Sequence, residues 1–299
     1  MNTDVIVRTT RLRAFLSLCK LRVNSLIVFT AMIGMLLAQT GLPPPLRFLA
    51  ATIGIGLVAF AAAAINCLIE RTVDARMART RGRPLPRGEI VPAEALSLSM
   101  AMGGIGLYVL HAWVNDLTLW LTLATFVGYA VIYTVVLKPA TPMNIVIGGA
   151  AGAMPPVLGW AAMTGQVTQE SIALFLIIFL WTPPHFWALC MARRDDYAKA
   201  GFPMLPVTHG IRHTCMQSLI YVALLSVASF LPVFLGMTGT AYAIAAATLD
   251  LIFLLRAFQL WRSYSDAASW RLFCYSITYL GALFAAMFLD RLVASWLPM

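Results

Sequence analysis

Charged side chains are scarce in this chain. Asp, Glu, Lys and Arg together make up 11% of its 299 residues, against roughly 25% in soluble domains. Hydrophobic residues make up 61%, and the mean hydropathy is +0.83. So few charges cannot cover the surface of a soluble protein. The composition therefore predicts a polytopic membrane protein.

Paired cysteines are also missing. The chain has five cysteines, with no CxxC pair and no paired positions in outward loops. They are predicted to be small apolar residues, without disulfides. The first 22 residues lack the short apolar core of a cleavable signal peptide. Together these absences favour a bacterial cell inner membrane as the location.

Long apolar runs are abundant. A hydrocarbon core of about 30 Å requires about 20 apolar residues in a helix. The predicted spans are 23–40, 48–67, 95–114, 117–137, 143–163, 171–192, 217–237, 241–256 and 272–296. We therefore predict an all-α bundle of nine transmembrane helices. A cytoplasmic segment, 1–22, precedes a single domain that covers 23–296.

The basic residues orient these spans. With a cytoplasmic N-terminus, 19 of the 21 lysines and arginines fall on the inner side, and only Arg47 and Arg291 lie opposite. The positive-inside rule therefore predicts a cytoplasmic N-terminus and a periplasmic C-terminus. The same asymmetry explains the net charge of +9, so it is no sign of nucleic-acid binding.

Two inward loops are long, 68–94 and 193–216. Prolines in both loops limit helix formation and fix turns. The remaining inward loops are short. We therefore expect these two loops to be structured, to cap the bundle at its inner end and to carry the active site.

Three oxygen-bearing side chains lie at the start of the first inward loop. Asn66, Glu70 and Asp74 are spaced four residues apart, so on a helix they share one face. Their oxygens suit Mg²⁺, which takes one or two carboxylates and keeps water or phosphate in its other positions. The alternative is an ordinary helix end whose acids pair with nearby arginines.

A second acidic pair, Asp195 and Asp196, follows the sixth span. Two carboxylate sites facing each other can hold two Mg²⁺ ions and clamp a diphosphate between them. Basic side chains would neutralise the remaining phosphate charge. The candidates for that role are Arg76, Arg79, Arg83, Lys138 and Lys199. The alternative for the arginines is membrane topology alone.

His185 lies inside the sixth span, next to Pro183 and Pro184, which are expected to break or kink that helix. An imidazole at this depth is a candidate haem ligand or proton carrier. The alternative is a histidine bonded to a neighbouring helix. His209 and Tyr197, in the second inward loop, are further candidates for haem contact.

Four segments resemble a known family. They are NCLIERTVDARMARTRGRPLP (66–86), KPATPMNIVIGGAAGAMPPVLGW (138–160), and PPHFWAL (183–189) with DYAKAGFPMLP (196–206). They are similar to the protoheme IX farnesyltransferases of the UbiA-type superfamily of intramembrane prenyltransferases. The resemblance extends over about 20–290.

The resemblance implies a reaction and its site. Asn66, Glu70, Asp74 and Asp196 would hold Mg²⁺ and farnesyl diphosphate. Haem b would be the second substrate, alkylated on a vinyl group to give haem O. The bilayer would be the setting, and haem A synthase or a terminal oxidase the expected partner.

One departure from the superfamily pattern is informative. The general first motif has an aspartate after the asparagine and another at its centre, whereas this chain has Cys67 and Glu70. The haem-type variant argues against the alternative of prenylating an aromatic quinone precursor. A transporter of anionic substrates is the remote alternative. The length of the prenyl tail and the histidine that meets the haem stay open.

Overall fold

The computed structural model describes residues 3–39, 41–78 and 80–296, and in this part of the chain helices are joined by turns and loops, without strands. In chain order the helices are α1 (Thr3–Leu18), α2 (Leu21–Leu37), α3 (Pro45–Ile69), α4 (Arg71–Asp74), α5 (Pro92–Trp113), α6 (Asp116–Val127), η1 (Gly128–Leu137), α7 (Lys138–Ala140), α8 (Asn144–Ala153), α9 (Pro155–Thr164), α10 (Gln169–Ala192), α11 (Arg194–Lys199), α12 (Leu205–Thr208), α13 (Gly210–Ala228), α14 (Leu231–Phe234), α15 (Thr240–Arg262) and α16 (Asp266–Trp296).

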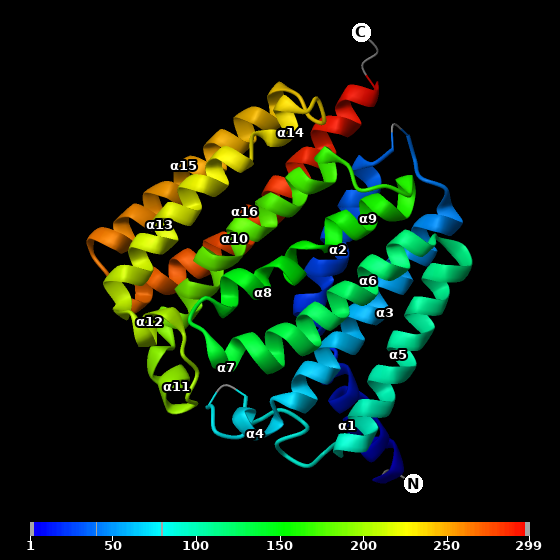
Figure 1. Cartoon of the computed structure of the whole chain (residues 1–299), viewed down its shortest axis with the longest axis vertical. Coiled ribbons are helices and arrows are strands. Elements are labelled where there is room, and N and C mark those ends of the chain that lie inside the picture. Colours follow the sequence, from blue (N-terminus) through cyan, green and yellow to red (C-terminus); the bar gives the residue numbers. More distant parts are fainter. Residues whose placement is uncertain (1–2, 40, 79, 297–299) are drawn as a thin grey trace.

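The predicted all-α membrane bundle is confirmed. Within the described residues, eight helical segments are long and apolar enough to cross a membrane, and a ninth is obtained if α1 and α2, which meet at a bend of 49°, form one span. α1 and the far end of α16 lie at opposite ends of the bundle (Figure 1). An odd number of crossings explains that arrangement.

Several helices run beyond the apolar segments that predicted them. α13 begins at Gly210 and not at residue 217, α15 continues to Arg262 and not to residue 256, and α16 begins at Asp266. Backbone hydrogen bonding does not depend on side-chain polarity. Hydropathy therefore finds the apolar part of a helix and misses its polar extension.

The sixth span is continuous. Pro183 and Pro184 were expected to break or kink this span. α10 runs through both without a break, so the expectation of a break is wrong. Thr182 donates a hydrogen bond from its Oγ1 to the carbonyl oxygen of Ile178 at 2.8 Å. Proline is tolerated in membrane helices because Ser and Thr side chains and neighbouring helices satisfy freed backbone groups.

The fifth span consists of two consecutive helices. α8 ends at Ala153 and α9 starts at Pro155. A Cβ atom on Gly148 would lie 2.1 Å from the ring of Tyr133, and one on Gly149 would lie 3.1 Å from Thr182. Small residues here allow the neighbouring helices to approach closely, as in other membrane bundles.

The two inward loops lie at the same end of the bundle (Figure 1). The first contains α4 and a series of turns, and the second contains α11 and α12. Met77 of the first loop shares a buried apolar cluster with Tyr197, Phe202 and Met204 of the second. The loops therefore pack against each other at this end of the bundle.

Candidate functional site

Three predicted metal ligands are buried where α3 ends. Asn66 lies in the last turn of α3, Glu70 follows that helix directly, and Asp74 closes the short helix α4. Their exposed fractions are 3%, 9% and 3%. Acidic side chains are almost never fully buried unless a partner compensates them. Each of these carboxylates accordingly has one.

Every member of this triplet contacts a basic side chain. Lys20 donates from Nζ to Asn66 Oδ1 at 2.5 Å, and Arg83 contacts Asp74 Oδ2 at 2.5 Å. Lys138 forms an ion pair with Glu70. The structure thus joins two of the predicted diphosphate-binding residues, Arg83 and Lys138, to the predicted metal ligands.

Two further polar side chains complete this cluster, and sequence reasoning missed both. In the sequence, Lys20 is only one of the basic residues that indicate the orientation of the spans. Thr134, in an apolar span, accepts a hydrogen bond from Asn66 Nδ2 at 3.1 Å and donates to the carbonyl oxygen of Tyr129 at 2.8 Å. It lies in the π-helix η1, a form that is frequent at functional sites. No periodicity in an apolar run indicates such a π-helix.

Lys138 connects the triplet to the second inward loop. It pairs with Glu70, and its Nζ also lies 4.6 Å from the centroid of the Phe202 ring. A cation over an aromatic face is attracted by the ring quadrupole. One ammonium group thus contacts the first acidic motif and the loop that carries the second.

The second acidic pair is more open to solvent. Asp196 is partly buried on α11, with Arg193 at 3.8 Å, while Asp195 is exposed. Lys199 and Arg76 are exposed as well. Arg79 falls outside the described residues. The structure therefore brings together the first motif, Arg83 and Lys138, and leaves Asp195, Arg76 and Lys199 at the surface.

The donor chemistry of the triplet suits a hard divalent cation. In the parts of the chain that the structure describes, no three His, Cys, Asp or Glu side chains gather as metal ligands. One amide and two carboxylates match Mg²⁺, which rarely takes more than two carboxylates from the protein. Zn²⁺, a borderline-soft metal, is usually bound by sets that include nitrogen or sulfur donors.

Glu70 is held in its charged form. Burial alone raises the pKa of its carboxyl, but the ion pair with Lys138, supported by Lys20 and Arg83, outweighs burial and leaves the pKa below the ordinary value. A lowered pKa in the folded protein adds stability that is present above the unfolded-state pKa and is lost as pH falls through the folded-state pKa.

Replacing Lys138 by methionine is expected to move the acid limb of the pH–activity profile to higher pH. Without the ammonium group, the largest contribution that lowers the pKa of Glu70 is lost, so burial raises this pKa relative to that of the unmodified protein. The pH dependence of kcat/KM is measured in detergent or lipid, and the values for each variant are normalised to that variant's own optimum. Lys199→Met, which removes an exposed charge from the other loop, is the control, and its acid limb should stay in place. An acid limb that does not move in Lys138→Met would contradict the role of Lys138 in lowering the pKa of Glu70.

The three candidates for haem contact have different surroundings. The ring of His185 is stacked between Trp181 and Phe273, with centroids at 4.2 and 4.7 Å, and its Nδ1 is 2.6 Å from Ser276 Oγ. His209 is exposed, with its Nδ1 2.8 Å from Thr208 Oγ1. Tyr197 is buried in the cluster between the two loops.

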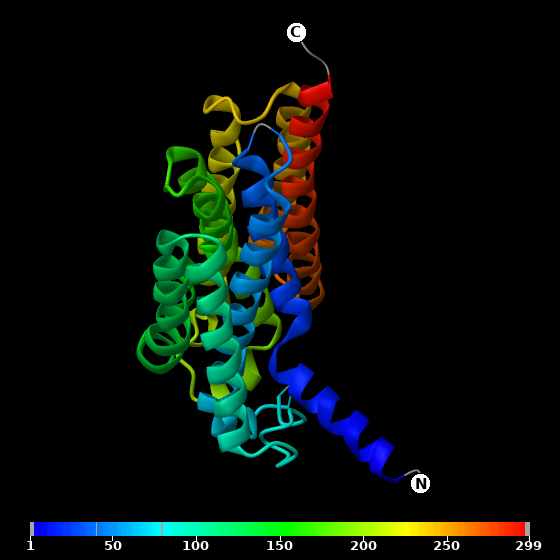
Figure 2. The same ribbon diagram turned by 90° about the vertical axis from the view of Figure 1, so that its right-hand side faces the viewer.

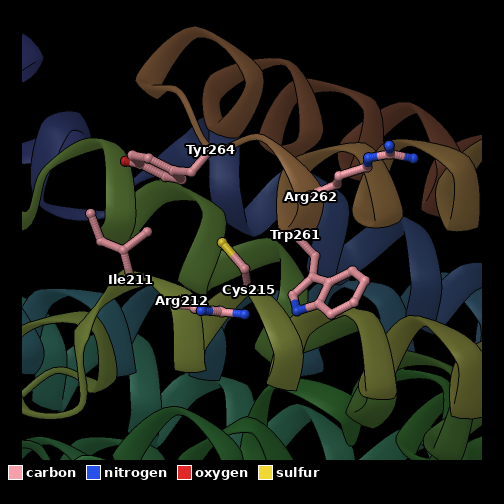
Figure 3. A pocket seen from close by; sticks show the side chains of 6 residues that line it. All are labelled: Ile211, Arg212, Cys215, Trp261, Arg262 and Tyr264. Carbon is pink, nitrogen blue, oxygen red and sulfur yellow. The ribbon is translucent and has the colours of Figure 1, made fainter.

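The inner end of the bundle also has a cleft of about 590 Å³ between α13 and α15 (Figure 3). Arg212, Trp261, Arg262 and Tyr264 contribute to its wall. None of the predicted site residues lines it. The cleft is separate from the acidic and basic cluster at the end of α3.

The structure is a bundle of apolar helices with acids, lysines and an arginine clustered at one end. Such an arrangement fits a molecule with an anionic head and an apolar tail. The sequence model of the UbiA prenyltransferase family matches residues 27–289. The chain belongs to the UbiA prenyltransferase family. Among curated proteins it is 66% identical over 283 residues to the protoheme IX farnesyltransferase of Dechloromonas aromatica (strain RCB), covering 95% of each chain.

Solved structures support the fold. A structure of digeranylgeranylglyceryl phosphate synthase matches 95% of this chain and 99% of its own, with a TM-score of 0.80 and 20% identity. A UbiA homologue from Archaeoglobus fulgidus bound to DMAPP and Mg²⁺ matches 90% of this chain and 98% of its own, with a TM-score of 0.63 and 16% identity. At these identities the likeness concerns the fold alone.

Proposed function

We propose that this enzyme converts haem b to haem O by transferring a farnesyl group from farnesyl diphosphate to a haem vinyl group, with release of diphosphate. The observation that carries the proposal is the buried cluster of Asn66, Glu70 and Asp74 with Lys138 and Arg83. The 66% identity to a protoheme IX farnesyltransferase supports the choice of substrates.

Bond cleavage requires stabilisation of the leaving group. The bond between the allylic carbon and the diphosphate oxygen breaks, and both electrons leave with the diphosphate. Arg83 and Lys138 can donate to those oxygens, and such electrostatic stabilisation is usually the largest contribution to catalysis. Bound Mg²⁺, two ions in our proposal, supplies further positive charge; Asn66, Glu70, Asp74, Asp195 and Asp196 are the proposed ligands.

Carbon–carbon bond formation follows at the allylic cation. The vinyl π electrons of haem b attack C1 of the farnesyl cation, so the terminal vinyl carbon forms the new bond. The positive charge passes to the vinyl carbon next to the porphyrin ring. Water adds there and loses a proton, which gives the hydroxyethylfarnesyl side chain. The apolar bundle excludes water from the first cation. Arg76, Arg79 and Lys199 are proposed to attract diphosphate at the inner mouth.

We further propose how the enzyme sits in the cell. Residues 23–296 form one prenyltransferase domain in the bacterial inner membrane, and loops 68–94 and 193–216 carry the active site. The N-terminus is cytoplasmic and the C-terminus periplasmic, as the basic residues indicate. Haem A synthase or a terminal oxidase would receive the product.

Mass spectrometry of haem from cells that express the chain tests the reaction. Haem O, heavier than haem b by one farnesyl group and one hydroxyl group, is the expected product. The measurement identifies the acceptor and the tail together. Folded protein that leaves haem b unchanged, when farnesyl diphosphate and Mg²⁺ are supplied in vitro, would overturn the proposal.

Replacing His185 by alanine is expected to lower the melting temperature while the Soret shift on haem addition persists. Its ring is stacked on both faces and its Nδ1 contacts Ser276, as expected of a side chain that ties α10 to α16. The shift is measured by titrating haem b into purified protein, with His209→Ala alongside. Loss of the shift in His185→Ala, but not in His209→Ala, would instead identify His185 as the haem contact.

A further inference from the structure

The elbow between α1 and α2 carries a strained residue. Lys20 has φ 46° and ψ 51°, and within the described residues every other positive φ belongs to glycine. Side chains larger than glycine rarely adopt this left-handed conformation. Such strain persists only where the surroundings impose it, and it is concentrated at functional sites.

Surrounding contacts impose the elbow. Asn24 donates from Nδ2 to the carbonyl oxygen of Cys19 at 2.6 Å, directly before the strained residue. Ala14 and Leu18 of α1 are buried in a cluster with residues of α3 and of the first inward loop. α1 leaves the axis of the bundle at an angle (Figure 2). The chain bends here in the conformation that points Lys20 toward α3.

The bend places a positive charge on a predicted metal ligand. Lys20 Nζ donates to Asn66 Oδ1 at 2.5 Å, and this amide oxygen is the atom that would bind Mg²⁺. Glu70, Asp74 and Arg83 lie close enough to Lys20 to act on its charge. An ammonium group and a metal ion repel each other, so both cannot remain on one amide oxygen without a compensating anion.

The cluster has a net positive charge, which favours binding of such an anion. Lys20, Arg83 and Lys138 carry three positive charges, against two negative charges on Glu70 and Asp74. Cationic side chains with charge-assisted hydrogen bonds are the usual partners of phosphate oxygens. Of these three basic residues, Lys20 is the one whose hydrogen-bond partner, Asn66, is uncharged. Lys20 can therefore move away without leaving a buried carboxylate unpaired.

We propose that Lys20 is a diphosphate-binding residue of this site, which holds Asn66 Oδ1 in the free enzyme and turns to the diphosphate when the substrate and its metal bind. This inference rests on the proposed function. Lys20 acts first as a placeholder for the metal on Asn66, and then as a ligand for the leaving group. The strained elbow keeps its Nζ within reach of both positions.

Two binding measurements on Lys20→Met test the exchange. Affinity for a non-hydrolysable analogue, farnesyl methylenediphosphonate with Mg²⁺, should fall about tenfold or more, because one charge-assisted contact is lost. Affinity for Mn²⁺ alone, followed by its electron paramagnetic resonance signal, should stay the same or rise. Lys20→Arg should recover most of the analogue affinity.

Controls separate this inference from a purely structural role. Arg22→Met removes an exposed positive charge from the same elbow and should leave both affinities unchanged. If Lys20 only orients Asn66, affinity for Mn²⁺ and for the analogue should fall together in Lys20→Met. Lys20→Gln, which keeps a hydrogen-bond donor without the charge, provides the same test should Lys20→Met fail to fold.

The outcomes also separate this inference from the proposed function. The expected tenfold loss of analogue affinity corresponds to about 1.4 kcal/mol. A change of only about twofold in Lys20→Met would overturn the role of Lys20 and leave the proposed function in place. An unmodified enzyme that binds no analogue and forms no haem O would overturn both. A selective loss of analogue binding establishes the exchange.

Discussion

Asp74→Asn is expected to reduce kcat for haem O formation at least about 100-fold, the usual cost of losing one preorganised electrostatic contact to a developing charge. Asp74 is 3% exposed, and its Oδ2 accepts a hydrogen bond from the guanidinium of Arg83 at 2.5 Å. The amide keeps the shape of the side chain and an acceptor for Arg83, but it loses the charge that would hold Mg²⁺. Product is measured by chromatography of extracted haem.

The isosteric change separates chemistry from folding. Removing one partner of a buried ion pair can destabilise a protein by about 3–5 kcal/mol, so alanine at this position would confuse the two effects. Glu89→Gln, which neutralises an exposed acid of the same loop paired with Arg87, is the matched control and should keep its activity. Activity in Asp74→Asn close to that of Glu89→Gln would remove Asp74 from the metal site.

The sequence was sufficient for those features that depend on composition and local spacing. Apolar length predicted the spans, and the four-residue spacing placed Asn66, Glu70 and Asp74 together at a helix end, where the structure has them. The family resemblance added the reaction. These inferences succeed because lipid thickness and helix geometry act on each segment separately.

The remaining features depend on contacts between distant segments. Lys20 meets Asn66 across 46 positions, and Thr134 meets it across 68, so neither pairing has a local pattern. The packing of Met77 against Tyr197 likewise requires both inward loops to be in place. The unbroken course of α10 through its two prolines depends on the surrounding helices.

Gly159→Ala is expected to reduce the yield of folded protein sharply and to destabilise what remains by about 3 kcal/mol or more, at the upper end of the usual cost of overpacking. A Cβ atom on Gly159 would lie 2.0 Å from the carbonyl oxygen of Ala31, and one on Gly34 would lie 2.3 Å from that of Pro156. α2 and α9 therefore cross backbone to backbone. Backbone atoms cannot rotate away as a flexible side chain can.

Gly104→Ala is the matched control, because a Cβ atom on this residue of α5 would meet nothing within 4 Å. It should be neutral or stabilising, since alanine favours a helix over glycine by up to about 1 kcal/mol. Folded yield is measured by size-exclusion chromatography and stability by thermal melting in the same detergent. Equal behaviour of the two variants would contradict the close crossing.

The same crossing links packing to catalysis. α2 begins immediately after Lys20, so a displacement of α2 from α9 would move the elbow and its ammonium group relative to Asn66. The Gly159→Ala protein that does fold should therefore also bind the diphosphate analogue more weakly, with Mn²⁺ binding less affected. A lipid that favours the folded bundle can restore the stability of Gly159→Ala. If analogue affinity stays low under that condition, the α2–α9 crossing positions the site as well as stabilising the fold.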